Sequence, residues 1–241
     1  MKNLLYIFLL ITSITFSQSD MMMIASQAQF ANEVGGGLDL SSANVRFIVG
    51  NSASLTTTDL AVKSILDSNT GTVQVTQPSN MNSITNHDFT VIAESITSSG
   101  VSGLKLETKP IITLEGGNWD EFNIGGAGSS TASLANCSLV NTHPITTGVA
   151  FPIDYNIDGL SQSQGTVFIG TIATSSAYIS NNTFDSGAHV IIAFDIGDTL
   201  EDSSIASEKR IFISGFNAQF WSGDIQTIFI NSMKWCYGVS I

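Results

Sequence analysis

The sequence predicts an α/β protein with a mostly parallel β-sheet, helices on both faces and a β-rich insertion. Short apolar runs at 45–50, 89–94 and 110–114 each end at a glycine or a carboxylate, as buried parallel strands often do. The segments between them are long enough for right-handed crossover connections. A stretch rich in Gly, Ser, Thr and Asn, residues 125–202, interrupts this pattern and indicates the insertion.

The chain begins with the features of an export signal. Lys2 is followed by an apolar run at residues 4–11, and small residues at 15 and 17 suit cleavage before Gln18. The run is too short to span a bilayer as a helix. We therefore expect residues 1–17 to be a signal peptide and the mature protein to be secreted or periplasmic, without a membrane span.

Residues 18–43 are polar and contain three consecutive glycines, which is typical of a flexible leader. One α/β domain is then expected over residues 44–241. Its first strand lies at 45–50. Hydroxyl residues at 54–58 can cap a helix whose core face is formed by Ala61, Val62, Ile65 and Leu66.

Further strands follow in order. Val73 and Val75 mark the second, and the apolar runs at 89–94 and 110–114 are the third and fourth. In the insertion, residues 166–172 and 189–194 have short β-like patterns. A strand at 210–215 precedes a final helix that Ser222 can cap and Gly238 can end, with Ile225, Ile228, Phe229 and Cys236 facing the core.

The charge balance excludes some classes of partner. Twenty acidic residues against eight basic ones give a net charge of −12, which makes nucleic acid a poor ligand. Abundant Ser, Thr and Asn indicate a neutral, hydroxyl-rich surface. Cys137 and Cys236, the only cysteines, could pair in an oxidising compartment or stay as buried free thiols, and the sequence leaves both alternatives open.

Three stretches of the chain resemble the ThuA-like branch of the class I glutamine-amidotransferase-like family. Residues 110–117 are similar to the nucleophile elbow, 142–148 to a His-Pro-Ile motif, and 209–238 to the closing strand and helix. The resemblance implies a flavodoxin-like sheet. Glu115 stands where the family's catalytic cysteine would be, and Phe216-Asn217-Ala218 replaces its His-x-Glu pair. Glutaminase activity is therefore not expected.

Several candidate site residues follow the predicted strands. Glu94 and Glu115 end neighbouring strands, so their carboxylates could share a proton, bind a hard cation or accept hydrogen bonds from sugar hydroxyls. Alternatively, each caps the segment that follows it. Asn51 and Ser52 would line the same edge, or only form a turn. Trp119 could be a platform for a sugar, or could cover the end of the sheet.

The histidines and the remaining acidic residues predict no metal site. His143 could act as an acid or base, or could brace its turn by hydrogen bonding. His87 and His189 lack metal-ligand spacing, and the acidic residues between 195 and 202 lack the spacing of a calcium loop. We therefore predict neither a metal nor a cofactor.

These observations lead to three functional hypotheses. The first is a secreted non-catalytic binding or interaction module, for a carbohydrate or another cell-surface component. The second is an enzyme that acts on sugars through Glu94, Glu115 and His143. The third is an extracellular structural or assembly protein, suggested by the Ser/Thr/Asn-rich segment.

Overall fold

The computed structural model describes residues 40–97, 100–125, 129–133, 136–154, 166–169, 177–182, 185–214 and 218–241. The expected signal peptide and most of the expected leader lie outside these residues. The described part begins with the 3₁₀ helix η1 (Leu40–Ser42), whose Leu40 side chain is buried. The ordered core thus starts four residues before the predicted boundary at Asn44, and all described residues belong to one compact unit, Gly36–Ile241.

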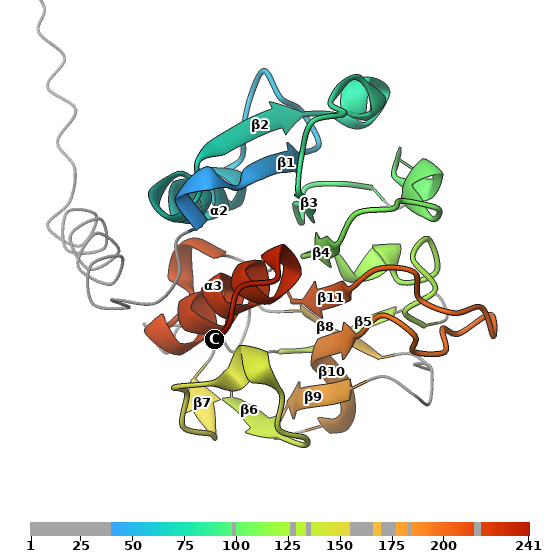
Figure 1. Cartoon of the computed structure of the whole chain (residues 1–241). Helices are drawn as coiled ribbons and strands as arrows, with labels where there is room; N and C mark the ends of the chain where they lie inside the picture. The colour runs from blue at the N-terminus through green and yellow to red at the C-terminus, as the bar shows by residue number, and fades with distance from the viewer. Residues whose placement is uncertain are drawn as a thin grey trace, which may run out of the picture. The chain divides into compact units, whose positions relative to one another are not determined.

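Five parallel strands form one side of the sheet and confirm the predicted α/β fold (Figure 1). Their spatial order is β2-β1-β3-β4-β11, which is the flavodoxin-like order 2-1-3-4-5. The chain order reverses between β1 and β3, at the position where flavodoxin-like proteins bind ligands. The strands are β1 (Asn44–Ile48), β2 (Thr72–Thr76), β3 (Phe89–Ile92), β4 (Ile111–Thr113) and β11 (Arg210–Ile213).

The predicted β-rich insertion extends this sheet beyond β11. Strand β10 pairs antiparallel with β11, and β9, β6 and β7 follow it in order (Figure 1). Strand β8 also pairs with β10 and carries β5. The bounds are β5 (Ser129–Ser133), β6 (Asn136–Leu139), β7 (Ile153–Asp154), β8 (Thr166–Ile169), β9 (Ala177–Asn182) and β10 (Asp185–Phe194).

Two α-helices cover one face of the parallel strands. Helix α2 (Thr57–Asn69) starts with a capping box between Thr56 and Asp59. Helix α3 (Gly223–Tyr237) starts at the Ser222 cap and ends at Gly238, whose φ of 81° is left-handed, as the sequence predicted. Their apolar residues pack against alternate strand residues, namely Val45, Phe47, Phe89, Val91, Ile112, Leu114, Ile211 and Ile213.

Short 3₁₀ helices cover the other face. These are η2 (Pro78–Ser83), η4 (Ser102–Leu104) and η5 (Gly116–Asn118). They and their adjoining loops supply Met81, Val101, Leu104, Trp119 and Phe122 to a second core with Ile48, Ile92, Ile111 and Phe212. The connection from β3 to β4 contains glycines and serines in place of an apolar run with helical spacing, which explains why it forms only a short turn of helix there.

Candidate functional site

Glu94 and Glu115 lie at the carboxyl edge of the parallel sheet. Each follows its strand, and β3 and β4 are adjacent, with Ile92 paired to Thr113. The sequence therefore predicted their common position correctly. Both residues are half-buried. Because the edge of a parallel sheet collects the ends of several strands, this is where a ligand site in such a fold is usually built.

Glu115 also forms the N-cap of η5. Its Oε1 accepts a hydrogen bond from the Gly117 backbone N–H at 2.7 Å. A Cβ at Gly117 would lie 2.9 Å from that oxygen, so the turn favours glycine there. The capping interpretation of Glu115 is thus confirmed for one of its oxygens, and it does not conflict with a position at the sheet edge.

The environment favours a proton on Glu115. Burial raises the pKa of Glu115 to about 7, the hydrogen bond from Gly117 acts in the opposite direction, and the nearby charge of Glu94 raises it further. Burial also raises the pKa of Glu94, with an additional contribution from Asp59. Near neutral pH the Glu115 carboxyl group therefore retains its proton much more readily than an ordinary glutamate does.

Asp59 and Ser95 complete this edge. Ser95 Oγ donates to Asp59 Oδ1 at 2.8 Å and accepts from the Gly50 backbone N–H at 3.0 Å. Asp59, only 1% exposed, also accepts from the Thr56 N–H at 3.0 Å. This chain of hydrogen bonds joins the ends of β1 and β3 at the point where strand order reverses. Sequence reasoning missed Asp59, although a Thr followed three residues later by Asp is a recognisable capping box.

Asn51 and Ser52 lie at the same edge and are exposed. Asn51 Oδ1 accepts from the Ala53 N–H at 3.0 Å, which forms an Asx turn. Ser52 Oγ donates to Gln77 Oε1 at 3.2 Å, at the end of the neighbouring strand β2. The structure confirms their position at the carboxyl edge and shows that both also stabilise the turn after β1.

The prediction that Trp119 lines this edge as a platform for a sugar is wrong. Its side chain is fully buried, with 0% exposure, and its ring meets Phe212 edge-on at 5.1 Å between centroids. The turn of η5 directs it into the second core, where it lies 5.8 Å from the ring of His189. Trp119 therefore covers the end of the sheet, which was the alternative interpretation.

His143 braces its own turn. It is the N-cap of η6 (Pro144–Thr146), and its Nδ1 accepts from the Ile145 N–H at 3.4 Å. Asn231 of α3 donates to the carbonyl oxygens of Ile145 and Thr147 at 3.1 and 3.0 Å. Two of the three stretches that carry the family resemblance, the His-Pro-Ile motif and the last helix, thus contact each other.

The structure does not bring His143 together with the two carboxylates, as the enzymatic alternative would require. The His143 ring packs edge-on against Trp235 at 4.8 Å, and Lys209 donates to the Trp235 carbonyl oxygen at 2.7 Å. Lys209 precedes β11, whereas Glu115 follows β4, which runs parallel to β11. His143 therefore lies near the amino ends of the strands. Burial lowers its pKa, so the imidazole is neutral at pH 7.

Neither cysteine could act as a nucleophile at the elbow. Cys137 on β6 and Cys236 on α3 are both buried and are not joined in a disulfide, so the structure favours the alternative of two buried thiols. Burial raises the pKa of Cys236 far above its usual value, which removes thiolate character. Both thiols therefore lie on elements other than the turn between β4 and η5 that carries Glu115.

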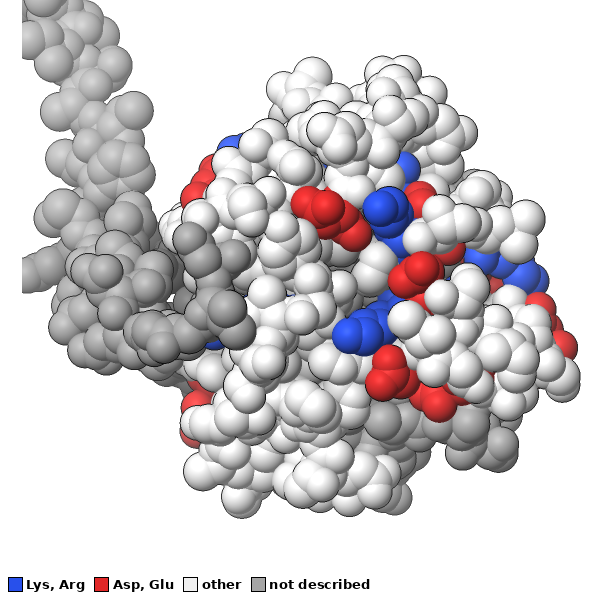
Figure 2. Space-filling model, viewed as in Figure 1, with Lys and Arg blue, Asp and Glu red and all other residues white. Residues whose placement is uncertain are grey.

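Over the described ranges, no group of three or more His, Cys, Asp or Glu side chains could hold a metal ion. The same ranges contain no helix that is long and apolar enough to cross a membrane. Figure 2 shows a face that is mostly uncharged, on which Lys and Arg are interspersed with Asp and Glu. Such a surface suits a neutral ligand better than a polyanion.

Comparisons with known proteins support the fold. No protein-family model matches the chain, and no curated protein matches it in sequence. Among solved structures, it is similar to a putative GMP synthase subunit from Thermoplasma acidophilum. The TM-score is 0.52 at 11% sequence identity, over 81% of this chain and 95% of the other. This likeness is compatible with the class I glutamine-amidotransferase-like fold that the sequence resembles.

Proposed function

We propose that this chain is a secreted, non-catalytic binding module of the ThuA-like branch of the amidotransferase-like fold, and that it binds neutral carbohydrate at the carboxyl edge of its sheet. The observation that carries the proposal is the state of Glu115. It occupies the elbow, caps its own turn through Gly117, and has a pKa raised to about 7 by burial. A carboxyl group in that position binds by hydrogen bonding and supplies no thiolate.

The chemistry of the two carboxyl groups matches sugar hydroxyls. A hydroxyl group both donates and accepts hydrogen bonds. When Glu115 holds a proton, it can donate, while the carboxylate of Glu94 accepts. Asp59, whose charge raises the pKa of Glu94, adds negative potential at this edge. An anionic ligand would be repelled there, and a neutral polyol would not.

The positions of the other predicted residues argue against the enzymatic alternative. His143 lies at the opposite edge of the sheet, where it contacts Trp235 of α3. It cannot act as an acid or base beside Glu94 and Glu115 without a rearrangement of η6. The remaining polar groups at the site, Asp59 and Ser95, hydrogen-bond to each other at 2.8 Å and hold the strand ends together.

Calorimetric titration of the full chain with neutral gluco-, xylo- and manno-oligosaccharides tests the proposal. We expect one of these to bind and Glu94→Gln to weaken it by about tenfold or more, the effect of losing a charge-assisted hydrogen bond, while Glu115→Gln, which keeps a donor and an acceptor, should weaken it less. Glu201→Gln, a change at an exposed carboxylate, is the matched control and should leave binding unchanged. The protein should not hydrolyse the oligosaccharide during these titrations. In a separate assay with glutamine it should release no ammonia.

Failure of all three sugar classes to bind would overturn the carbohydrate assignment. Binding that both Glu variants leave unaffected would instead place the ligand elsewhere on the chain. Sugar hydrolysis abolished by Glu115→Gln would establish the enzymatic alternative.

A further inference from the structure

A second buried polar cluster lies at the amino edge of the sheet, away from the proposed sugar site. It fastens residues 100–110, which we call the strap, over the second core. The strap contributes Val101 and Leu104 to that core and leads into β4. Its backbone forms local hydrogen bonds, from the Leu104 N–H to Val101 at 2.8 Å and from the Glu107 N–H to Leu104 at 2.9 Å, and joins β3 only at its last residue, where the Thr90 N–H donates to the Pro110 carbonyl oxygen at 2.9 Å.

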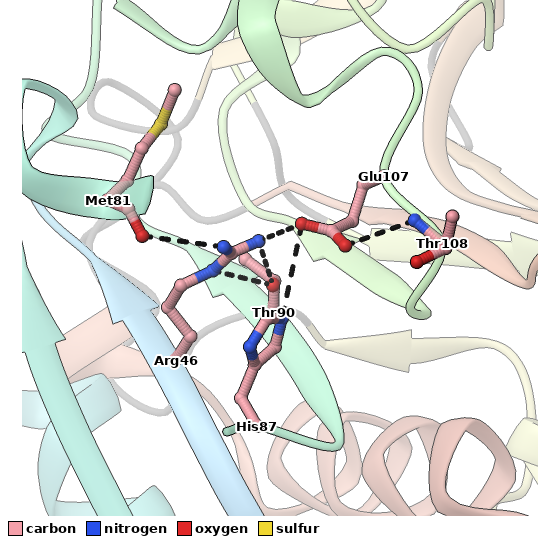
Figure 3. Close-up of polar contacts among 6 residues, drawn as sticks. All are labelled: Arg46, Met81, His87, Thr90, Glu107 and Thr108. Atoms are coloured by element: carbon pink, nitrogen blue, oxygen red, sulfur yellow. Dashed lines mark hydrogen bonds and ion pairs between the residues drawn. The ribbon is translucent and has the colours of Figure 1, made fainter. Parts of the chain in front are cut away.

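An ion pair between Arg46 and Glu107 joins the strap to the sheet (Figure 3). Arg46 of β1 is only 3% exposed, and its guanidinium also donates to Thr90 Oγ1 at 2.9 and 3.1 Å and to the Met81 carbonyl oxygen at 3.4 Å. Glu107 accepts a further hydrogen bond from the Thr108 N–H at 3.0 Å. The guanidinium and the carboxylate therefore hold each other inside a largely buried environment.

His87 lies directly beside this pair. It is 6% exposed, and its Nε2 is 3.9 Å from the Glu107 carboxylate, too far for a hydrogen bond (Figure 3). Among the described residues, neither of its ring nitrogens has a hydrogen-bond partner. A neutral imidazole is tolerated in this position, whereas a protonated one would be a second cation beside Arg46 without a hydrogen-bonded anion of its own.

We propose that His87 and the Arg46–Glu107 ion pair form an acid-sensitive latch, which keeps the strap closed at neutral pH and releases it as the pH falls. In the closed state the proton is excluded from His87. When the strap opens, the imidazole reaches water and can be protonated. Opening of the strap is therefore coupled to the uptake of one proton.

The charges around His87 give the direction of this coupling. Burial lowers the pKa of His87, and Arg46 lowers it further; Glu107 raises it, Lys109 lowers it and Asp88 raises it. The net pKa is below the ordinary value of 6.5. A group with a lowered pKa of this kind stabilises the closed state above pH 6.5, and that stability is lost as the pH falls from 6.5 toward the lowered pKa.

The middle of the strap has an anchor that does not depend on His87. Arg210 of β11 donates to the Lys105 carbonyl oxygen at 3.1 Å and also to that of Phe122. Lys105 in turn lies 3.5 Å from the Asp202 carboxylate. Since these contacts do not involve the imidazole, acid should loosen the strap locally around Glu107 and leave the parallel sheet folded.

Hydrogen exchange measured by mass spectrometry on the full chain at pH 7.5 and 5.5 tests the latch, with rates corrected for the intrinsic effect of pH. We expect the opening equilibrium of peptides covering residues 100–110 to rise by about tenfold on acidification, because the imidazole of the open strap takes up one proton at its ordinary pKa of 6.5, which lies one unit above the final pH. Peptides from α3 should show no such rise.

His87→Leu is the decisive variant, because it removes the titrating group without breaking a hydrogen bond. We expect equal strap protection at both pH values. His143→Gln, which removes a different half-buried imidazole, is the matched control and should leave the acid response intact.

Should His87→Leu not fold, Glu107→Gln replaces it, and its strap should already be loosened at pH 7.5. The proposal is overturned if the wild-type strap is insensitive to pH, if His87→Leu keeps the response, or if Glu107→Gln leaves strap protection at pH 7.5 unchanged.

Discussion

Gly117 donates its backbone N–H to Oε1 of Glu115 at 2.7 Å, so this carboxyl group caps the turn that holds it. This relationship explains how Glu115 can be structural and still belong to the proposed binding site. One oxygen is directed back to the η5 turn, while burial and the proximity of Glu94 keep the pKa of the group near neutrality.

Glu115→Gln should stabilise the protein at high pH and have little effect at low pH. The folded pKa of about 7 lies above the ordinary value of 4.5, so the stability that the protonated Glu115 contributes is fully present below pH 4.5 and is lost as the pH rises from 4.5 through 7. The amide retains an oxygen for Gly117 and does not ionise. Urea unfolding should show a gain of roughly 1–3 kcal/mol at pH 8 and nearly none at pH 5. A loss of stability at both pH values would show that Glu115 acts chiefly as a charged cap.

Gly50→Ala should destabilise the sheet edge. The Cβ of an alanine at this position would lie 2.4 Å from the backbone oxygen of Ser95, so the ends of β1 and β3 would have to separate. We expect a cost of about 1–3 kcal/mol in thermal or urea unfolding. Gly103→Ala is the control, because its Cβ would meet only Met81 Cε at 3.4 Å. Equal stability of the two variants would contradict the close approach of these strand ends.

Asn231→Ala should separate the structural role of the His-Pro-Ile motif from ligand binding. The buried Asn231 amide makes two hydrogen bonds to the η6 turn, and its loss should cost about 2 kcal/mol. Oligosaccharide binding at the opposite edge should not change. A variant that keeps its stability but loses its ligand would place the motif in the binding site.

Much of the fold could be predicted because the sequences of the buried strands are short apolar runs that a polar residue follows, as at Glu94 and Glu115. The final helix was predicted together with both ends because Ser222 and Gly238 have strong capping preferences. The expected edge position of both carboxylates followed from strand adjacency alone.

The directions of Trp119 and His143 could not be predicted in the same way. Whether Trp119 points to the sheet edge or into the core depends on the orientation that the 3₁₀ turn of η5 gives to its side chain. Such a short turn shows no repeating pattern of apolar residues from which that orientation could be predicted. His143 follows β6 in the insertion, and only tertiary contacts with Trp235 and Asn231 determine which edge of the sheet its turn reaches.

The expected export signal leads to a simple prediction. The charged start, the apolar run and the small residues before Gln18 predict cleavage after Ser17. Intact-mass analysis of protein collected outside the cytoplasm should therefore give a chain that starts at Gln18. Exported protein that retains Met1 would contradict this prediction.

The carboxyl group of Glu115 offers the most direct test of the proposed binding site. Its ¹³C chemical shift can be followed over a pH titration, first in the free protein and then with a saturating concentration of an oligosaccharide that calorimetry has shown to bind. We predict that Glu115 titrates near pH 7 in the free protein and that the bound sugar displaces its shift and its midpoint. Glu201, as an exposed reference, should be unaffected by the sugar. Titration of Glu115 near its ordinary value of 4.5, with a shift that the bound sugar leaves unchanged, would contradict the assignment of this edge as the binding site.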